Sequence, residues 1–134
     1  MQDFRKLIVW EKAQELTLHI YKATRKFPTD EKFGLIAQMR SASSSMGANI
    51  ADGCGRGSQR EFLRYLYIAT GSAFEIENHI LLAQQLDYLD EKSAASLIEG
   101  VVEIKKNTFW SDSQGQGDML NELKWSITAN EKEG

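Results

Sequence analysis

One segment, residues 43–66, constrains the fold more than any other part of the chain; it reads SSSMGANIADGCGRGSQREFLRYL. It joins the small-residue end of one predicted helix to the start of another, through three glycines in five positions. Ser58 and Glu61 match the capping box, in which each side chain satisfies a free backbone amide of the first turn. The segment therefore predicts two helices joined by a tight turn, with Gly53 as the left-handed cap of the first.

Apolar residues recur at three- and four-residue steps in four stretches of the chain, which predicts four helices. Phe27-Pro28 ends the first, because the residue before proline is pushed out of the helical region. Thr29 and Asp90 are suited to cap the second and the fourth. The predicted helices span residues 7–26, 30–52, 59–86 and 91–110.

Four long helices with short connections predict an all-α fold, an antiparallel up-down four-helix bundle over residues 1–112. The sequence SDSQGQGD after Trp110 is typical of a flexible break. Residues 113–134 are therefore expected to form a flexible linker and a short amphipathic, helical C-terminal extension. That extension presents Met119, Leu120, Leu123, Trp125 and Ile127.

The third predicted helix is apolar around much of its circumference. One stripe consists of Phe62, Leu66, Ala69, Ala73, Ile76, Ile80 and Ala83, and Leu63, Tyr65, Tyr67, Phe74 and Leu81 widen it. A helix this broadly apolar has partners on two sides. The pattern therefore predicts that the protein associates with copies of itself.

Composition indicates one globular domain, since 134 residues that are 42% hydrophobic, with a single proline, suffice to bury a core. No apolar run approaches the roughly 18 residues that span a bilayer. The polar start MQDFRK does not resemble a signal peptide. We expect a bacterial-type cytoplasmic protein without a membrane partner, in which the single Cys54 forms no internal disulfide.

The net charge of −3 hides an asymmetry along the chain. Residues 1–65 hold 11 Lys and Arg against 7 Asp and Glu, whereas residues 66–134 hold 5 against 12. Arg56, Arg60 and Arg64 are spaced by four, and Arg40 is expected to approach them from the preceding helix. These four arginines are the candidate nucleic-acid-binding residues. They are equally suited to pair with carboxylates of a neighbouring subunit.

Catalytic and metal-binding patterns do not fit the sequence. The glycine segment follows a helix and lacks the Gly-Lys-Ser/Thr of a phosphate loop. The pairs Glu15…His19 and Glu75…His79 are spaced by four, one residue more than the Glu-x-x-His of di-iron bundles. No Ser-His-Asp or Cys-His signature is present. We expect a protein that is not an enzyme and has neither metal nor cofactor, with partly exposed structural histidines and with Cys54 packed at the turn.

Several motifs together resemble a bacterial family of small four-helix bundle proteins, named for intervening sequences in 23S ribosomal RNA genes and often called S23 ribosomal proteins. The matching residues are Val9-Trp10-Glu11-Lys12-Ala13, Phe27-Pro28, Glu31, Phe33-Gly34-Leu35, Gln38-Met39-Arg40, Ser45, Asn49-Ile50-Ala51-Asp52-Gly53, Arg56, Glu61-Phe62, Ile68-Ala69-Thr70-Gly71-Ser72 and Glu75. The resemblance covers about residues 4–105. It implies an up-down bundle that assembles into a ring-like homo-oligomer, commonly a pentamer, and it supplies no catalytic residue.

A related branch, the accessory protein of diversity-generating retroelements, resembles this chain in fold, binds nucleic acid through a basic surface and partners a reverse transcriptase. The acidic balance of the present chain departs from that branch. We expect a non-enzymatic homo-oligomeric scaffold with weak affinity for RNA or DNA through the arginines. The alternative is an interaction module that docks a partner protein without nucleic acid.

Overall fold

The structure, a computed structural model, describes residues 3–114 and consists of four α-helices and two short 3-10 helices in that range. The elements are η1 (Phe4–Lys6), α1 (Ile8–Thr24), η2 (Thr29–Glu31), α2 (Leu35–Cys54), α3 (Gln59–Gln85) and α4 (Glu91–Gln114). No strand occurs among the described residues. The predicted all-α helical bundle is confirmed. None of the described helices combines the length and the apolarity that a membrane crossing requires.

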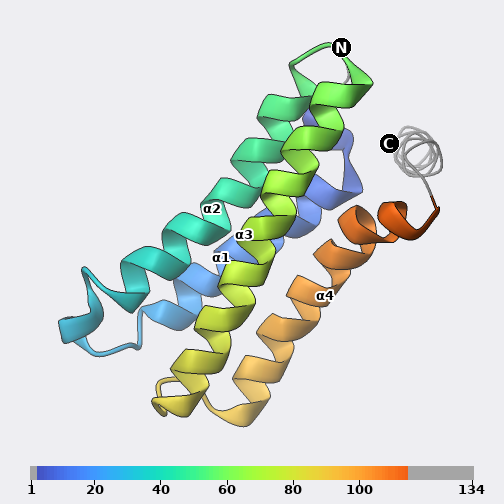
Figure 1. The fold of residues 1–134 in the computed structure, drawn as a ribbon. Coiled ribbons are helices and arrows are strands. Elements are labelled where there is room, and N and C mark those ends of the chain that lie inside the picture. Colours follow the sequence, from blue (N-terminus) through green and yellow to red (C-terminus); the bar gives the residue numbers. More distant parts are fainter. Residues whose placement is uncertain (1–2, 115–134) are drawn as a thin grey trace.

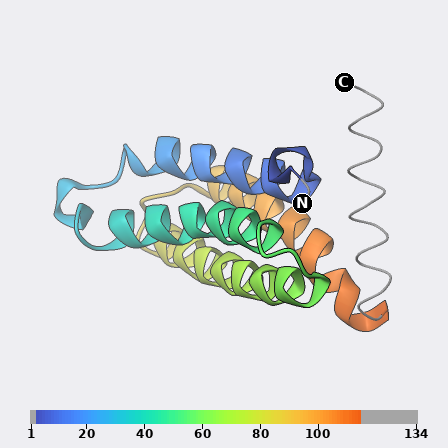
Figure 2. The same ribbon diagram turned by 90° about the horizontal axis from the view of Figure 1, so that it is seen from above.

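The four helices lie side by side, and successive helices run back and forth along the bundle (Figures 1 and 2). Each helix packs on its neighbour in the chain, and α1 also packs on α4, which closes the bundle. A polar contact lies at each of these interfaces. These contacts are Thr17 Oγ1 to the Ser43 carbonyl at 3.0 Å, Ser45 Oγ with Ser72 Oγ at 2.6 Å, Lys105 with Glu77, and Lys12 Nζ with Glu103 Oε2 at 2.6 Å.

The core consists of one apolar stripe from each helix. Every member of the stripe predicted for α3, from Phe62 to Ala83, is buried. Its most completely buried partners include Leu7, Ile20, Met39, Met46, Ile50, Val101 and Ile104. Burying each large side chain contributes about 1.5–3 kcal/mol, so this shared core is the main stabilising term.

The second helix starts later than the sequence predicts. Thr29 does not cap α2, because residues Thr29–Glu31 form the separate helix η2. Gly34, with φ −107° and ψ −113°, interrupts the helical path. The carboxylate of Glu31 then accepts a hydrogen bond from the backbone N–H of Leu35 at 3.1 Å. A side chain expected inside the first turn thus satisfies the amide with which α2 begins.

Gly53 is not the left-handed cap that the sequence predicts. It lies inside α2, and the positive φ of the α2–α3 turn, 78°, belongs to Gly57. Gly53 is buried, and a Cβ atom built on it would lie 2.6 Å from the Cβ atom of Tyr65. A glycine is needed here for the close approach of α3, and the turn itself comes four residues later.

The caps of the last two helices confirm the sequence prediction. Ser58 Oγ accepts from the backbone N–H of Glu61 at 3.2 Å, and Asp90 Oδ1 accepts from that of Ser93 at 2.6 Å. The fourth helix continues to Gln114, past the predicted end at Trp110. The segment from residue 111 to Gln114 contains no glycine or proline, and Gly115 follows it in the sequence. The predicted C-terminal amphipathic segment lies outside the described residues.

Candidate nucleic-acid interface

The turn between α2 and α3 positions Arg56. Its guanidinium NH2 group lies 3.2 Å from Asp52 Oδ2, and its Cζ atom lies 4.9 Å from the centre of the Tyr65 ring. The hydrogen bond to Asp52 raises the pKa of Arg56, so the group is positively charged at any physiological pH. Tyr65 is in turn held against Gly53. The contact between Gly53 and Tyr65 therefore fixes the ring on which the Arg56 guanidinium stacks.

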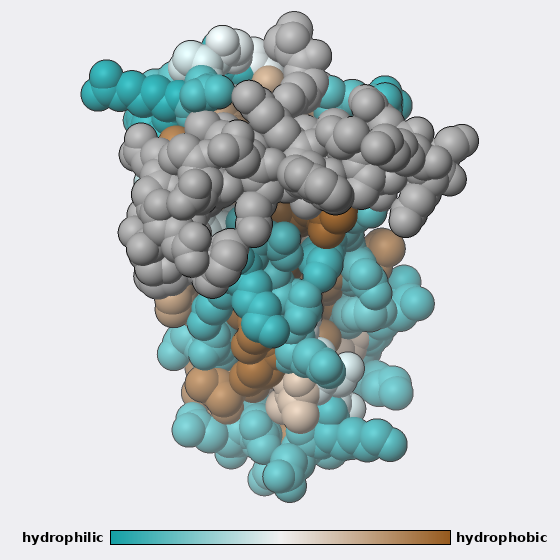
Figure 3. Space-filling view, turned by 90° about the vertical axis from the view of Figure 1, so that its right-hand side faces the viewer, coloured by the Kyte–Doolittle hydropathy of each residue, from teal (hydrophilic) through white to brown (hydrophobic). Residues whose placement is uncertain are grey.

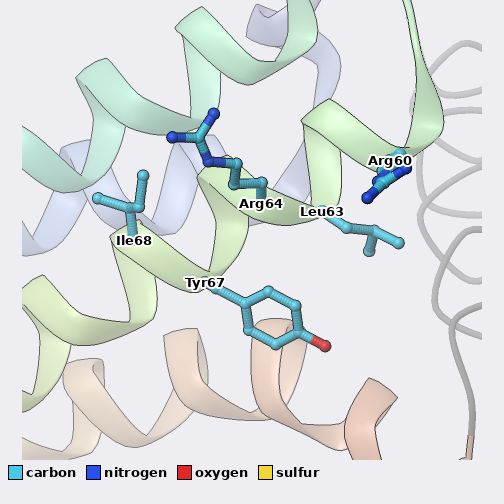
Figure 4. A pocket seen from close by; sticks show the side chains of 5 residues that line it. All are labelled: Arg60, Leu63, Arg64, Tyr67 and Ile68. Atoms are coloured by element: carbon cyan, nitrogen blue, oxygen red, sulfur yellow. The ribbon is translucent and has the colours of Figure 1, made fainter.

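Arg60 and Arg64 lie together on the outward side of the first turns of α3, as their spacing predicts. They line an open hollow of about 430 Å³ with Leu63, Tyr67 and Ile68, which we term the arginine hollow (Figure 4). All five side chains come from α3. Arg64 NH1 lies 3.6 Å from Glu61 Oε2, whereas no carboxylate in the described part of the chain pairs with Arg60.

Arg40 is not brought to the other three arginines. It lies near the start of α2, and the 14 residues from Arg40 to Cys54 place it about 21 Å from the end of that helix. Its side chain turns to α1, where Nε donates to Thr24 Oγ1 at 2.9 Å and the guanidinium stacks on the Tyr21 ring at 4.7 Å. Arg40 therefore ties α2 to α1, and the candidate interface is reduced to Arg56, Arg60 and Arg64.

The arginine hollow combines positive charge with apolar surface. Leu63 is almost fully buried at its base, while Tyr67 and Ile68 remain 39% and 43% exposed. Sequence reasoning identified the arginines but not Ile68, which falls outside the buried stripe. Its position four residues after Arg64 was the available signal. The combination suits a ligand with anionic and apolar groups side by side, such as a nucleotide strand or an amphipathic peptide.

The remaining candidates from the sequence do not form a reactive site. Burial raises the pKa of the Cys54 thiol, which lies at the last residue of α2 and is half-buried, so the nucleophilic thiolate is disfavoured. His79 is buried, at 8% exposure, where the sequence predicts a partly exposed side chain. Its Nε2 atom lies 3.6 Å from Glu75 Oε1. Among the described residues no cluster of His, Cys, Asp and Glu is arranged to hold a metal ion.

A second groove lies between α1 and α4 and has a volume of about 360 Å³. The sequence alone did not predict it. Its polar lining is mostly acidic, with Glu15, Glu99 and Glu103 beside Lys12 and His19. The hydrogen bond from Lys12 lowers the pKa of Glu103, which keeps that carboxylate ionised. A groove of this charge repels phosphate, so it is not an alternative nucleic-acid site.

A large apolar surface accompanies the arginines. We call the side chains of Tyr67, Ile68, Phe74, Leu81, Leu82 and Leu86, each between 39% and 47% exposed, the outer face of α3. Phe74 is partly covered by Lys105 of α4, whose Nζ atom lies 4.0 Å from the ring centre. On the adjoining side of the molecule, hydrophobic atoms stay visible among hydrophilic ones (Figure 3). These side chains make the outer face of α3 a candidate contact surface.

Comparisons with known proteins agree with this architecture. The sequence model of the 23S rRNA-intervening sequence protein family matches residues 5–109. A crystal structure of a protein of unknown function from the S23 ribosomal protein family of Bacteroides thetaiotaomicron VPI-5482 has 26% sequence identity and a TM-score of 0.66. The match covers 74% of this chain and 93% of that one. No curated protein matches the chain.

Proposed function

The chain belongs to the 23S rRNA-intervening sequence protein family, and from that premise we propose that it is a non-enzymatic helical-bundle scaffold that forms a homo-oligomeric ring, such as a pentamer, and binds RNA or DNA weakly. The observation that carries the proposal is the outer face of α3, six large and partly exposed apolar side chains on one helix. Contact with a second copy removes this surface from water, at about 25 cal/mol for each Å² buried.

The arginines supply the nucleic-acid part of the proposal. Arg56, Arg60 and Arg64 lie at the end of the bundle where α3 begins, and side-chain exposures of 47% and 68% leave Arg56 and Arg64 accessible. In a ring each subunit contributes one copy of these three arginines. One nucleic-acid strand can then contact several copies, which multiplies the modest affinity of a single copy. Arginines of this kind contact phosphates and give affinity without sequence preference.

The oligomer is tested by light scattering at micromolar concentration. We expect a mass several times the 15.2 kDa of one chain. The variant with both Leu81→Glu and Leu82→Glu should fall to the monomer mass, because the two carboxylates that it brings to each contact cannot be buried. Leu18→Glu is the matched control, since Leu18 is 63% exposed on α1, away from this face. A monomeric native protein contradicts the scaffold proposal.

Nucleic-acid binding is tested with a fluorescent single-stranded RNA titrated at several salt concentrations. We expect affinity to fall steeply as salt rises. The triple substitution of Arg56, Arg60 and Arg64 by alanine should flatten that dependence. Arg25→Ala, at the far end of α1, is the control and should leave it unchanged. Binding that is indifferent both to salt and to the triple substitution contradicts the phosphate mechanism.

One observation favours the second candidate, a module that docks a partner protein. The arginine hollow places Leu63, Tyr67 and Ile68 directly beside two guanidinium groups, which suits an acidic amphipathic helix as well as a nucleotide strand. The test is affinity capture of this protein from its host. Recovery of a partner protein in stoichiometric amount, with no nucleic acid protected from nuclease, favours this candidate.

A further inference from the structure

We propose that the acidic, apolar segment 118–127 of this same chain binds the arginine hollow. The hollow is lined by two positively charged side chains and three largely apolar ones (Figure 4). Its occupant therefore carries carboxylates and apolar groups in alternation. This inference goes beyond the scaffold function and does not require nucleic-acid binding. Tyr67 and Ile68 belong both to the hollow and to the outer face of α3, so the segment and a second copy would compete for these two side chains.

The register of α4 against α3 brings the end of the described chain to the hollow. Lys105 of α4 is paired with Glu77 and stacked on Phe74 of α3. The short connection between Gln85 and Glu91 makes these two packed helices antiparallel. Nine residues beyond Lys105 therefore lie level with nine residues before Phe74 and Glu77, since both helices rise about 1.5 Å per residue. Gln114 thus ends level with residues 65–68.

Three residues connect Gln114 to the proposed segment. Residues 115–117 are Gly-Gln-Gly, which reach about 10 Å when extended. This length allows residue 118 to reach the arginines on the neighbouring helix. A tether of this kind keeps the segment at an effective concentration of about 1 mM or more at the hollow. That tether favours the same chain over a second copy at micromolar concentration.

The sequence of the segment complements the hollow in spacing as well as in charge. Asp118 and Glu122 are four residues apart, as are Arg60 and Arg64. Met119 and Leu123 repeat the same interval, as do Leu63 and Tyr67. Residues four apart share one face of a helix, so in a helical segment these rows would meet those of the hollow, with carboxylate against guanidinium and apolar against apolar. Binding of the segment covers Arg60 and Arg64 and so competes with phosphate for them.

The test is disulfide trapping in the full-length protein, with Cys54→Ser as background. Tyr67→Cys is combined with Leu123→Cys, and the control combines Leu18→Cys, on the exposed side of α1, with Leu123→Cys. Under mild oxidation in dilute solution we expect the first pair to close an intrachain disulfide about tenfold faster, because docking holds residue 123 beside residue 67 and away from residue 18. Equal rates for the two pairs overturn the proposal.

A mixing experiment distinguishes the same chain from a second copy. Chains carrying only Tyr67→Cys are mixed with isotope-labelled chains carrying only Leu123→Cys. Disulfide dimers that form as fast as the intrachain bond place the segment on a neighbouring copy and overturn the proposal as stated. Their absence supports it. Neither outcome requires RNA, so failure here is separate from failure of the scaffold or phosphate proposals.

Charge exchange provides a second readout that does not depend on cysteine placement. In the trapping background, Asp118→Lys with Glu122→Lys should slow closure roughly tenfold, since two partly exposed ion pairs become repulsive. Adding Arg60→Glu and Arg64→Glu should restore the rate. Rescue supports direct pairing of segment and hollow. A rate that the first exchange leaves unchanged, or that the second does not restore, overturns that pairing.

Discussion

The backbone of Gly53 in α2 packs directly against the side chain of Tyr65 in α3: a Cβ atom built on Gly53 would lie 2.6 Å from the Cβ atom of Tyr65. The guanidinium of Arg56 stacks on the ring of the same Tyr65, with its Cζ atom 4.9 Å from the ring centre. The packing of α2 on α3 and the position of Arg56 therefore both depend on the absence of a side chain at residue 53.

Gly53→Ala should lower the free energy of unfolding by about 1–3 kcal/mol, because the added methyl forces two helix backbones apart. Gly55→Ala is the matched control two residues away. Its new Cβ would meet nothing closer than 3.5 Å, and its φ of −82° suits alanine. That control should be neutral or slightly stabilising. Urea unfolding at one fixed protein concentration measures both, and equal effects would contradict the close-approach interpretation.

Ser58→Ala should destabilise the protein by about 1 kcal/mol, because the backbone N–H of Glu61 loses its acceptor at the start of α3. Ser58→Asp keeps an acceptor at the cap and should retain the native stability. Thermal unfolding followed by circular dichroism compares the two. If the alanine variant melts with the native protein, the cap contributes nothing.

Asp90 should make stability fall in acid. The hydrogen bond from the Ser93 backbone N–H lowers the pKa of Asp90 below its ordinary value of 3.8. A lowered pKa in the folded state means that the stabilisation is complete above about pH 3.8 and is lost as pH falls through the folded value. Glu103 and Asp3, whose pKa values are also lowered, add to the same loss.

The Asp90 contribution is isolated by comparison with Asp90→Asn, which keeps the cap acceptor but does not titrate. Urea unfolding from pH 7 to pH 2 should show that the native protein loses more stability than the variant below pH 3.8. Parallel curves for the two proteins would assign the acid sensitivity to other carboxylates.

His79→Leu should raise the free energy of unfolding by about 1 kcal/mol. Both ring nitrogens of His79 are buried without a hydrogen-bond partner in the described part of the chain. Replacing an unsatisfied buried polar group by an apolar one of similar size removes its desolvation cost. His19→Leu, on an exposed position of α1, is the control and should change little. A less stable His79→Leu variant would show that the imidazole has a polar role in the native assembly.

Local chemistry explains which predictions from the sequence are confirmed. Ser58 and Asp90 cap their helices as expected, because a cap joins residues only three apart. The buried stripe of α3 is likewise correct, since helical spacing alone decides which side chains share a face. The common hollow of Arg60 and Arg64 follows from the same four-residue spacing.

Contacts between helices explain the predictions that are wrong. Sequence spacing assigned Gly53 to a cap, whereas the approach of Tyr65 buries it inside α2. Arg40 was grouped with the other arginines, yet Thr24 and Tyr21 of α1 hold it near the opposite end of α2. Neither partner is visible in the local sequence, because helix packing brings together residues far apart in the chain.

The sequence by itself determined the presence of the four helices, the caps at Ser58 and Asp90, the buried stripe and the family, because these depend on spacing within a few turns. Only the tertiary structure decided which arginines share a surface and which apolar residues of α3 remain outside the core. It also placed the end of α4 level with the arginine hollow. These relations depend on the register and the closeness of packed helices, which side-chain shapes on both partners set together.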